Sequence, residues 1–438
     1  MRHSALVLAA GSLLLAAGCG SPGGSAPGGK VPVEVVAFQG GYGIDFFQDA
    51  AGEYSKLDPK VEVKVTGDPR VWEALRPRLV AGDVPDLMFP GWGMDHWALV
   101  NDGALQELDA ALDEKAYNSD QTWRSTFRPG LLDLCQKDGK TYMLPLYVMI
   151  YGWWYDPGVF AKNGWVPPQT WDELLDFGEK CKAKGVAPIA FQGQYPYYMI
   201  EGMLLPWACS IGGIEAVNAA QNLDPGAWSS PAMLQAAKMI AELRDKGFFL
   251  KGSVAMSHTE AQTQFLNGKA AMVPCGSWIE AEMKSTMPPG AQVAFMPVPD
   301  AVGGKGDPTA LLIGIEPWMV PTTAKHPKEA IEFFRYMTSL DKAKQFVTEK
   351  GTLMAIQGSD DTEMPPSLEA PARALAGSKT VWSVQYRTWY PAMQEELEGA
   401  MTSLLNSQLT PEQFVTRCEA AADKTRKDSA VTKYKVSS

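Results

Sequence analysis

The sequence lacks the patterns by which metal-dependent and nucleotide-dependent enzymes are usually recognised. Only four of its 438 residues are histidines, and no two of them have the spacing of zinc ligands. The GxxxxGK[S/T] phosphate loop, the GxGxxG dinucleotide fingerprint and the GxSxG nucleophile elbow are all missing. Acidic pairs such as Glu395 and Glu396 are most simply explained as exposed charges. The sequence therefore predicts no cofactor, no metal and no readable catalytic group.

Basic charge is also scarce, with 39 Lys and Arg against 50 Asp and Glu, which gives a formal net charge of −11. Since affinity for nucleic acid depends on Lys and Arg that neutralise phosphates, nucleic acid is not expected as a partner. No apolar run reaches the roughly 18 residues of a membrane-spanning helix. A hydrophobic share of 46% over this length is instead typical of a globular chain with several folded units.

The first thirty residues have the pattern of a bacterial export signal. A short positive start precedes the apolar residues 5–17, and small residues lead from them to Cys19. Gly, Pro and Ser dominate the residues that follow, a composition typical of a flexible tether. The placement of Cys19 resembles a lipobox. We predict a signal peptide over 1–18 and a lipid-anchored tether over 19–30, with plain secretion or a buried N-terminal helix as alternatives.

Cysteines are few, and none has the CxxC spacing of zinc or thioredoxin-like sites. If Cys19 carries lipid, an odd number remains, so at least one thiol has no partner within the chain. Export favours one or two disulfides, but the sequence leaves their pairing open. The remaining cysteines are Cys135, Cys181, Cys209, Cys275 and Cys418.

From Val31 onward, β-branched runs alternate with segments of helical periodicity. Such alternation predicts βαβ units, mostly parallel sheets and an α/β fold. The predicted strands are Val31–Phe38, 61–65, 86–89, 188–191, 270–274, 293–297 and 310–320, and the apolar, aromatic segment Leu144–Tyr155 lies among them. The predicted helices are Asp45–Leu57, Val71–Ala81, 171–184, 231–246, 259–267 and Pro327–Met337, followed by a largely helical part that includes 390–405 and Pro411–Lys427. With no long linker after residue 31, two lobes must be joined closely.

Aromatic residues stand at the predicted ends of several strands. The chain has 14 Trp and 14 Tyr. Ligands of open α/β sheets bind beyond the carboxyl ends of the strands, where flat rings suit the apolar faces of a pyranose and polar side chains take its hydroxyls. Core packing explains any one of these rings equally well, but several together favour a carbohydrate ligand.

Several short segments follow one another in a characteristic order along the chain. They are GDVPDLMF at 82–89, GKTYMLP at 139–145, WYDPGVF at 154–160, PQTWDEL at 168–174, FLNGKAAM at 265–272, GSW at 276–278 and the helix Pro327–Met337. In this order they resemble the segments of bacterial extracellular solute-binding proteins of the carbohydrate class, which are receptors of ABC importers. The resemblance covers residues 31 to about 427.

This resemblance implies a two-lobe fold like that of the periplasmic binding proteins, with hinge crossings and a helical C-terminal part. We expect residues 31–146 with 300–350 to form one lobe and 147–299 with 351–438 to form the other. The chain would be a monomer that closes over a mono- or oligosaccharide, loosely of the chito-oligosaccharide type, and delivers it to a membrane permease. Its location would be extracytoplasmic.

The ligand contacts implied by the resemblance come from loops after several strands, from the hinge and from a late aromatic helix. Trp92 and Trp278 are the strongest of them, because stacking is their usual role in similar proteins. The full set is Gln39, Tyr42, Trp92, Tyr147, Tyr195, Tyr197, Trp278, Glu316 and Trp389.

Binding without turnover is the expected function, so the protein is not expected to be an enzyme. A secreted glycoside hydrolase is the alternative, and it would need two carboxylates about 5–10 Å apart, one of them with a raised pKa. A lipoprotein adhesin would instead expose a large apolar patch.

Overall fold

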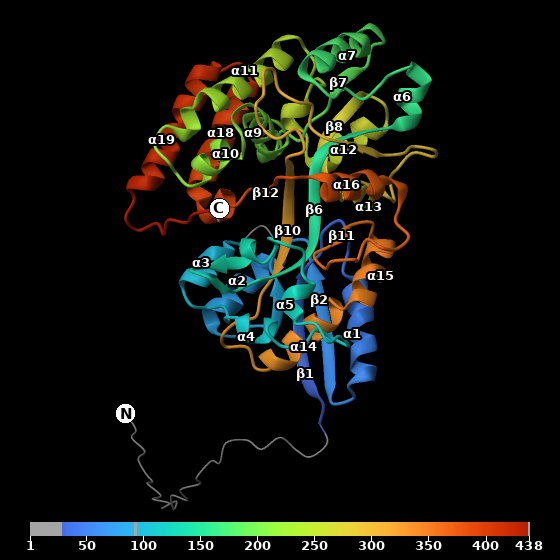
Figure 1. Ribbon diagram of the computed structural model, residues 1–438, viewed down its shortest axis with the longest axis vertical. Coiled ribbons are helices and arrows are strands. Elements are labelled where there is room, and N and C mark those ends of the chain that lie inside the picture. Colours follow the sequence, from blue (N-terminus) through green and yellow to red (C-terminus); the bar gives the residue numbers. More distant parts are fainter. Residues whose placement is uncertain (1–28, 92–93, 437–438) are drawn as a thin grey trace, which may run out of the picture.

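The computed structural model describes residues 29–91 and 94–436, and these form an α/β molecule of two lobes (Figure 1). The predicted signal peptide, most of the tether, Cys19 and Trp92 lie outside the described residues. Within the described part of the chain, no helix is both long and apolar enough to cross a membrane.

The first lobe is built on a parallel sheet of three strands in the order β2-β1-β3. Strand β1 pairs along its whole length with β2, and its alternating Val side chains are buried between the sheet and helices such as α1 and α14. The strands are β1 (Val31–Phe38), β2 (Val61–Asp68) and β3 (Leu87–Phe89). The main helices are α1 (Asp45–Leu57), α2 (Val71–Ala81), α3 (His96–Asn101), α4 (Asp109–Leu112), α5 (Trp123–Thr126), α14 (Pro327–Met337) and α15 (Leu340–Lys350).

A long strand, β6 (Leu144–Tyr155), runs between the lobes beside β10 (Leu311–Trp318), as Figure 1 shows. The first part of β6 pairs with β10 and β11 (Leu353–Met354), and its second part pairs with β8 (Ala270–Gly276) and β9 (Ala294–Met296). All of these pairs are antiparallel. The expected parallel pairing is confirmed in the first lobe and for β7 (Ala187–Ile189) with β8 and β10 with β12 (Val381–Ser383).

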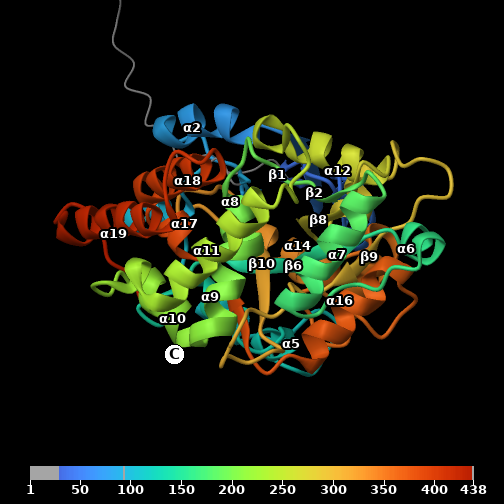
Figure 2. The ribbon, with the colours of Figure 1, turned by 90° about the horizontal axis from the view of Figure 1, so that it is seen from above.

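Helices surround the strands of the second lobe. Seen from above in Figure 2, α18 and α19 lie beside α11 on one side, and α6, α7 and α12 lie on the other. Helix α7 starts at a capping box in which Thr170 and Glu173 satisfy each other's backbone N–H groups. The helices are α6 (Pro157–Asn163), α7 (Trp171–Ala183), α8 (Tyr197–Met199), α9 (Leu205–Gly212), α10 (Ile214–Gln221), α11 (Pro231–Asp245), α12 (His258–Leu266), α13 (Ile279–Met283), α16 (Pro366–Gly377), α17 (Tyr386–Trp389), α18 (Pro391–Leu405) and α19 (Pro411–Lys427).

The expectation of disulfides is wrong. All five cysteines of the described chain are free and buried. They lie on separate elements, where each thiol packs as a small apolar group, and burial raises the pKa of each. Their burial therefore reflects core packing. The limits of the lobes and the exact hinge crossings stay a prediction.

Candidate ligand-binding site between the lobes

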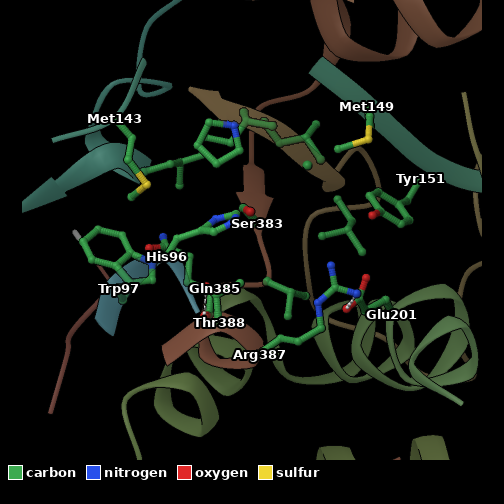
Figure 3. Close-up of a pocket in the computed structure, with 17 residues that line it drawn as sticks. His96, Trp97, Met143, Met149, Tyr151, Glu201, Ser383, Gln385, Arg387 and Thr388 are labelled. Atoms are coloured by element: carbon green, nitrogen blue, oxygen red, sulfur yellow. Dashed lines mark hydrogen bonds and ion pairs between the residues drawn. The ribbon is translucent and has the colours of Figure 1, made fainter. Parts of the chain in front are cut away.

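Residues from both lobes line a small cavity of about 60 Å³ next to β6 and β10 (Figure 3). His96 and Trp97 come from α3 of the first lobe. Met149 and Tyr151 come from β6, and Arg387 from α17 of the second lobe. Because elements of both lobes meet here, a ligand at this cavity would contact both lobes.

A buried ion pair forms one wall of the cavity. The Arg387 guanidinium lies 3.0 Å from a carboxylate oxygen of Glu201 and is centred 4.6 Å from the ring of Tyr197 (Figure 3 shows the ion pair). Burial raises the pKa of Glu201 to about 7, although Arg387 opposes this change. A guanidinium held on one side by a carboxylate and over a ring has a fixed orientation in the wall of the cavity.

His96 fixes the loop that precedes α3. Its Nε2 lies 2.7 Å from the carbonyl oxygen of Gly91, and burial lowers the pKa of its imidazole to about 4. The ring is therefore neutral at pH 7 and donates through Nε2–H. Asp95 caps α3 by accepting the N–H of Ala98. These contacts anchor the described residues on both sides of Trp92.

The structure brings three predicted site residues together beside β6 and β10. The ring of Tyr42 meets that of Tyr147 edge to face at 5.0 Å, and Phe346 stacks on Tyr147 at 5.7 Å. Tyr147 donates its hydroxyl to Glu316, whose other oxygen accepts from the Trp318 indole at 2.8 Å. Burial raises the pKa of Glu316 to about 8. Burial therefore favours the protonated carboxyl, against the hydrogen bonds from Tyr147 and Trp318, which favour the carboxylate.

A second group of predicted residues, Tyr195, Tyr197 and Trp278, lies in the second lobe. Trp278 meets Tyr151 edge to face at 5.4 Å, which connects it to the wall of the small cavity. A Cβ at Gly276 would lie 1.9 Å from the Trp278 ring. Glycine at this position therefore lets the indole fold back over the end of β8. Tyr195 is 39% exposed, and the centroid of its ring lies 6.3 Å from that of Tyr197.

The loop after β1 reaches across to the second lobe. A Cβ at Gly41 would lie 3.2 Å from Cβ of Glu282 in α13. Glu282 accepts from Gln262 at 2.8 Å and lies 3.1 Å from Nε2 of His258, and this hydrogen bond raises the pKa of His258. Gln39 is apart from these groups: it is exposed, and its backbone N–H donates to the carbonyl of Asp68.

Trp389 lines a separate, larger cavity of about 430 Å³ between α3 and the last helices. Trp97 lines both cavities, so they share a wall. The Trp389 side chain is buried, and its indole N–H has no hydrogen-bond acceptor within the described residues. An unpaired buried donor is costly, and this one is covered by protein atoms, so the Trp389 ring and not its N–H group faces the cavity.

Sequence reasoning missed Glu201, Arg387, Tyr151, His96 and Trp97. A signal existed for Glu201, which is the one charged residue in the apolar stretch 198–209. Arg387 is two residues before the predicted Trp389, but nothing in the sequence pairs it with a distant glutamate. Among the described residues, no cluster of His, Cys, Asp or Glu is arranged to hold a metal ion.

Comparisons with known proteins find related sequences and a similar fold. The diacetylchitobiose binding protein NgcE of Streptomyces coelicolor is 29% identical over 415 residues, which cover 92% of this chain and 87% of that protein. The multiple sugar-binding protein of Streptococcus mutans is 25% identical over 76% of this chain and 77% of its own. A solved structure of a chitin oligosaccharide binding protein, 25% identical, superposes with a TM-score of 0.76 over 90% of this chain and 98% of its own.

A sequence profile identifies the family. Residues 40–344 match that of the bacterial extracellular solute-binding proteins, a span that runs from α1 to the start of α15 and therefore includes parts of both lobes. The chain belongs to the bacterial extracellular solute-binding protein family.

Proposed function

We propose that this protein is a carbohydrate receptor of an ABC importer, which closes its lobes over a mono- or oligosaccharide and passes it unchanged to a membrane permease. The observation that carries the proposal is the set of aromatic side chains that both lobes place around the cavities between them. Trp97 of the first lobe, Tyr151 of β6 and Trp389 of the second lobe line these cavities, and Trp278 meets Tyr151 edge to face. Rings of this kind stack on the apolar faces of sugars.

Chito-oligosaccharides are the ligand class that we favour. Two similar proteins are named for binding diacetylchitobiose and chitin oligosaccharides. The apolar methyl of the N-acetyl group of such a ligand would pack on the aromatic rings that line the cavities. Ligand would favour the closed form only through its extra affinity for that form.

Turnover is not part of the proposed function. A glycosidase needs a pair of carboxylates across the bond to be cleaved. Of the described residues that line the smaller cavity, Glu201 alone carries a carboxylate, and it is paired with Arg387. The other strongly buried glutamate, Glu316, is hydrogen-bonded to Tyr147 and Trp318.

We further propose that the chain is exported, cleaved before Cys19 and held at the membrane by lipid on that residue, as a monomer. The sequence pattern around Cys19 supports this placement. Radiolabelled palmitate should be incorporated by the wild type and not by Cys19→Ala. Labelling of both proteins would contradict the anchor at Cys19.

Calorimetry and thermal melts with a carbohydrate panel test the function. Diacetylchitobiose and longer chito-oligosaccharides should raise the melting temperature, whereas maltose, cellobiose and raffinose of matched concentration serve as comparisons. Incubation with the bound sugar should leave it intact. Released products would favour a glycoside hydrolase, and the absence of any shift over the whole panel would contradict a carbohydrate receptor.

A further inference from the structure

The segment that follows α19, residues 428–436, runs from the second lobe toward α3 of the first (Figure 1). We call it the post-α19 strap. Its far end is fixed beside α10. Lys435 donates to the carbonyl of Asn222 at 3.0 Å and pairs with Asp224 at 3.1 Å, and the N–H of Val436 donates to the Asn222 side chain at 2.7 Å. The strap is therefore held by the second lobe on both sides of its centre.

Tyr434, at the centre of the strap, contacts both lobes. Its hydroxyl donates to the side-chain oxygen of Asn101 in α3 at 2.7 Å, and its ring lies 5.4 Å from that of Trp97 in the same helix. On the other side, the ring stacks on Trp389 of α17, with the centroids 5.3 Å apart and the planes 18° from parallel. Its backbone N–H donates to the Tyr390 hydroxyl at 2.9 Å. A buried, fully hydrogen-bonded side chain thus joins α3 to α17.

The strap also forms part of the wall of the larger cavity. Tyr434 lines this space of about 430 Å³ together with Trp97 and Trp389. The strap therefore leaves room for a ligand beside it. Since Trp389 is a predicted ligand contact, the ring stacked on it determines where its indole faces and which part of it a ligand can reach.

We propose that the post-α19 strap clasps the two lobes on the α3 side, and that Tyr434 is a positioning residue which holds Trp389 for the ligand. The clasp is independent of what the protein binds. The effect on ligand contact rests on the proposed function. In the full chain, the strap should slow opening of the lobes and so slow release of the bound sugar.

The clasp is tested without any ligand. Tyr434→Ala, and a chain that lacks residues from 429 onward, should exchange the amide protons of α3 at least tenfold faster and show a larger radius of gyration in X-ray scattering. Lys433→Ala is the matched control, because this exposed side chain of the strap contacts only carbonyls of the strap itself. Unchanged exchange and unchanged size in both variants would overturn the clasp, provided that near-UV circular dichroism shows native packing.

The hydrogen bond between the strap and α3 is tested separately, since removal of a whole ring can disturb folding. Tyr434→Phe keeps the ring and loses only the hydroxyl, and should speed α3 exchange about fivefold, as expected for one hydrogen bond. Asn101→Ala should match it, and the double variant should add nothing more. Asn101 also accepts a hydrogen bond from Lys137. The variant Lys137→Ala is therefore the control that measures the effect of losing this second contact. Additive effects of the two changes would overturn the proposed bond.

Ligand release is the last readout. With diacetylchitobiose, Tyr434→Ala should raise koff at least fivefold and leave kon within twofold. Tighter binding without the strap would overturn the proposal, because the strap would then compete with ligand for Trp389. If no sugar of the panel binds the wild type, the proposed function fails, and the exchange experiment still decides whether the strap clasps the lobes.

Discussion

Trp278 is the residue at which loss of one ring should cost most ligand affinity. Its indole folds over the end of β8 because Gly276 leaves space, and Tyr151 supports its edge. Trp278→Ala should weaken binding by about 2 kcal/mol, or about 30-fold, as is usual for a central aromatic anchor. Calorimetry with the sugar that the panel identifies measures this loss. Trp278→Phe should recover part of it, and an alanine variant with wild-type affinity would remove Trp278 from the site.

Glu316 makes the free energy of unfolding depend on pH. Burial raises its pKa to about 8 in the folded protein, so between about pH 5 and 8 the folded state binds the proton and the unfolded state does not. Its contribution to stability is therefore complete in acid and is lost as pH rises through 8. Glu316→Gln, which cannot ionise, should be more stable than the wild type at pH 9 by on the order of 4 kcal/mol, because each unit of raised pKa corresponds to about 1.4 kcal/mol.

Denaturant melts of both proteins from pH 5 to 9 measure this difference. The comparison must be made at each pH, because His96 acts in the opposite sense. The lowered pKa of His96 makes the folded state more stable above about pH 6.5 and less stable in acid. His96 is present in both proteins, so its effect cancels when they are compared at the same pH. Parallel stability curves for the wild type and Glu316→Gln would show that the folded Glu316 pKa is ordinary.

At the scale of elements, the loop after β7 owes its path to Gly193. A Cβ at this position would lie 2.3 Å from the Cα of Val254, while the Gly193 N–H donates to the carbonyl of Ser253 at 2.9 Å. Gly193→Ala should therefore push the loop outward, together with Tyr195 and Tyr197. We expect a loss of about 1–3 kcal/mol in stability and a clear loss of ligand affinity.

Urea melts and calorimetry check the Gly193 prediction. Gly52→Ala is the matched control, because a Cβ there meets nothing within 4 Å on the exposed face of α1, and alanine favours a helix. It should leave affinity unchanged. If Gly193→Ala is destabilised but binds with wild-type affinity, the loop does not contribute to the site.

Elements with one buried face could be predicted from the sequence, and elements buried on all sides could not. In α1 (Asp45–Leu57) the buried Phe46, Ala50 and Tyr54 recur at helical spacing, and its limits are confirmed to the residue. Residues 200–212 are mostly buried in every direction, so α9 and the π-helical turn before it give no periodic signal. The antiparallel pairing of β6 was likewise unreadable, because an apolar strand does not encode the direction of its neighbours.

The same limit applies to the candidate site. Aromatic residues at strand ends could be selected, since ring type and position are visible in the sequence. The contacts between distant residues could not be predicted. Glu201 pairs with Arg387, and the ring of Tyr434 contacts those of Trp97 and Trp389, only in the folded protein. Ion pairs and ring contacts of this kind depend on tertiary structure alone.

At the scale of the whole molecule, the two lobes share strands rather than a loose linker. Strand β6 pairs with β10 over Leu144–Ile150 and with β8 from Tyr151 onward, so one continuous strand belongs to both halves. We expect bending where the partner of β6 changes, near Ile150 and Tyr151. A ligand next to Tyr151 would then lie near the axis of closure, and its contacts with α3 and α17 would be those that closure makes or breaks.

The part of the molecule that the structure describes also folds without disulfide bonds, although its cysteines suggested otherwise. All five thiols of the described chain are buried and unpaired, and burial both excludes reagents and raises the thiol pKa. In a chain that carries Cys19→Ser, Ellman's reagent should find no reactive thiol in the native protein and five after denaturation in guanidinium. Dithiothreitol should leave the melting temperature unchanged. Fewer than five thiols in the denatured protein, or a melting temperature that falls on reduction, would show a disulfide and contradict a core held by packing alone.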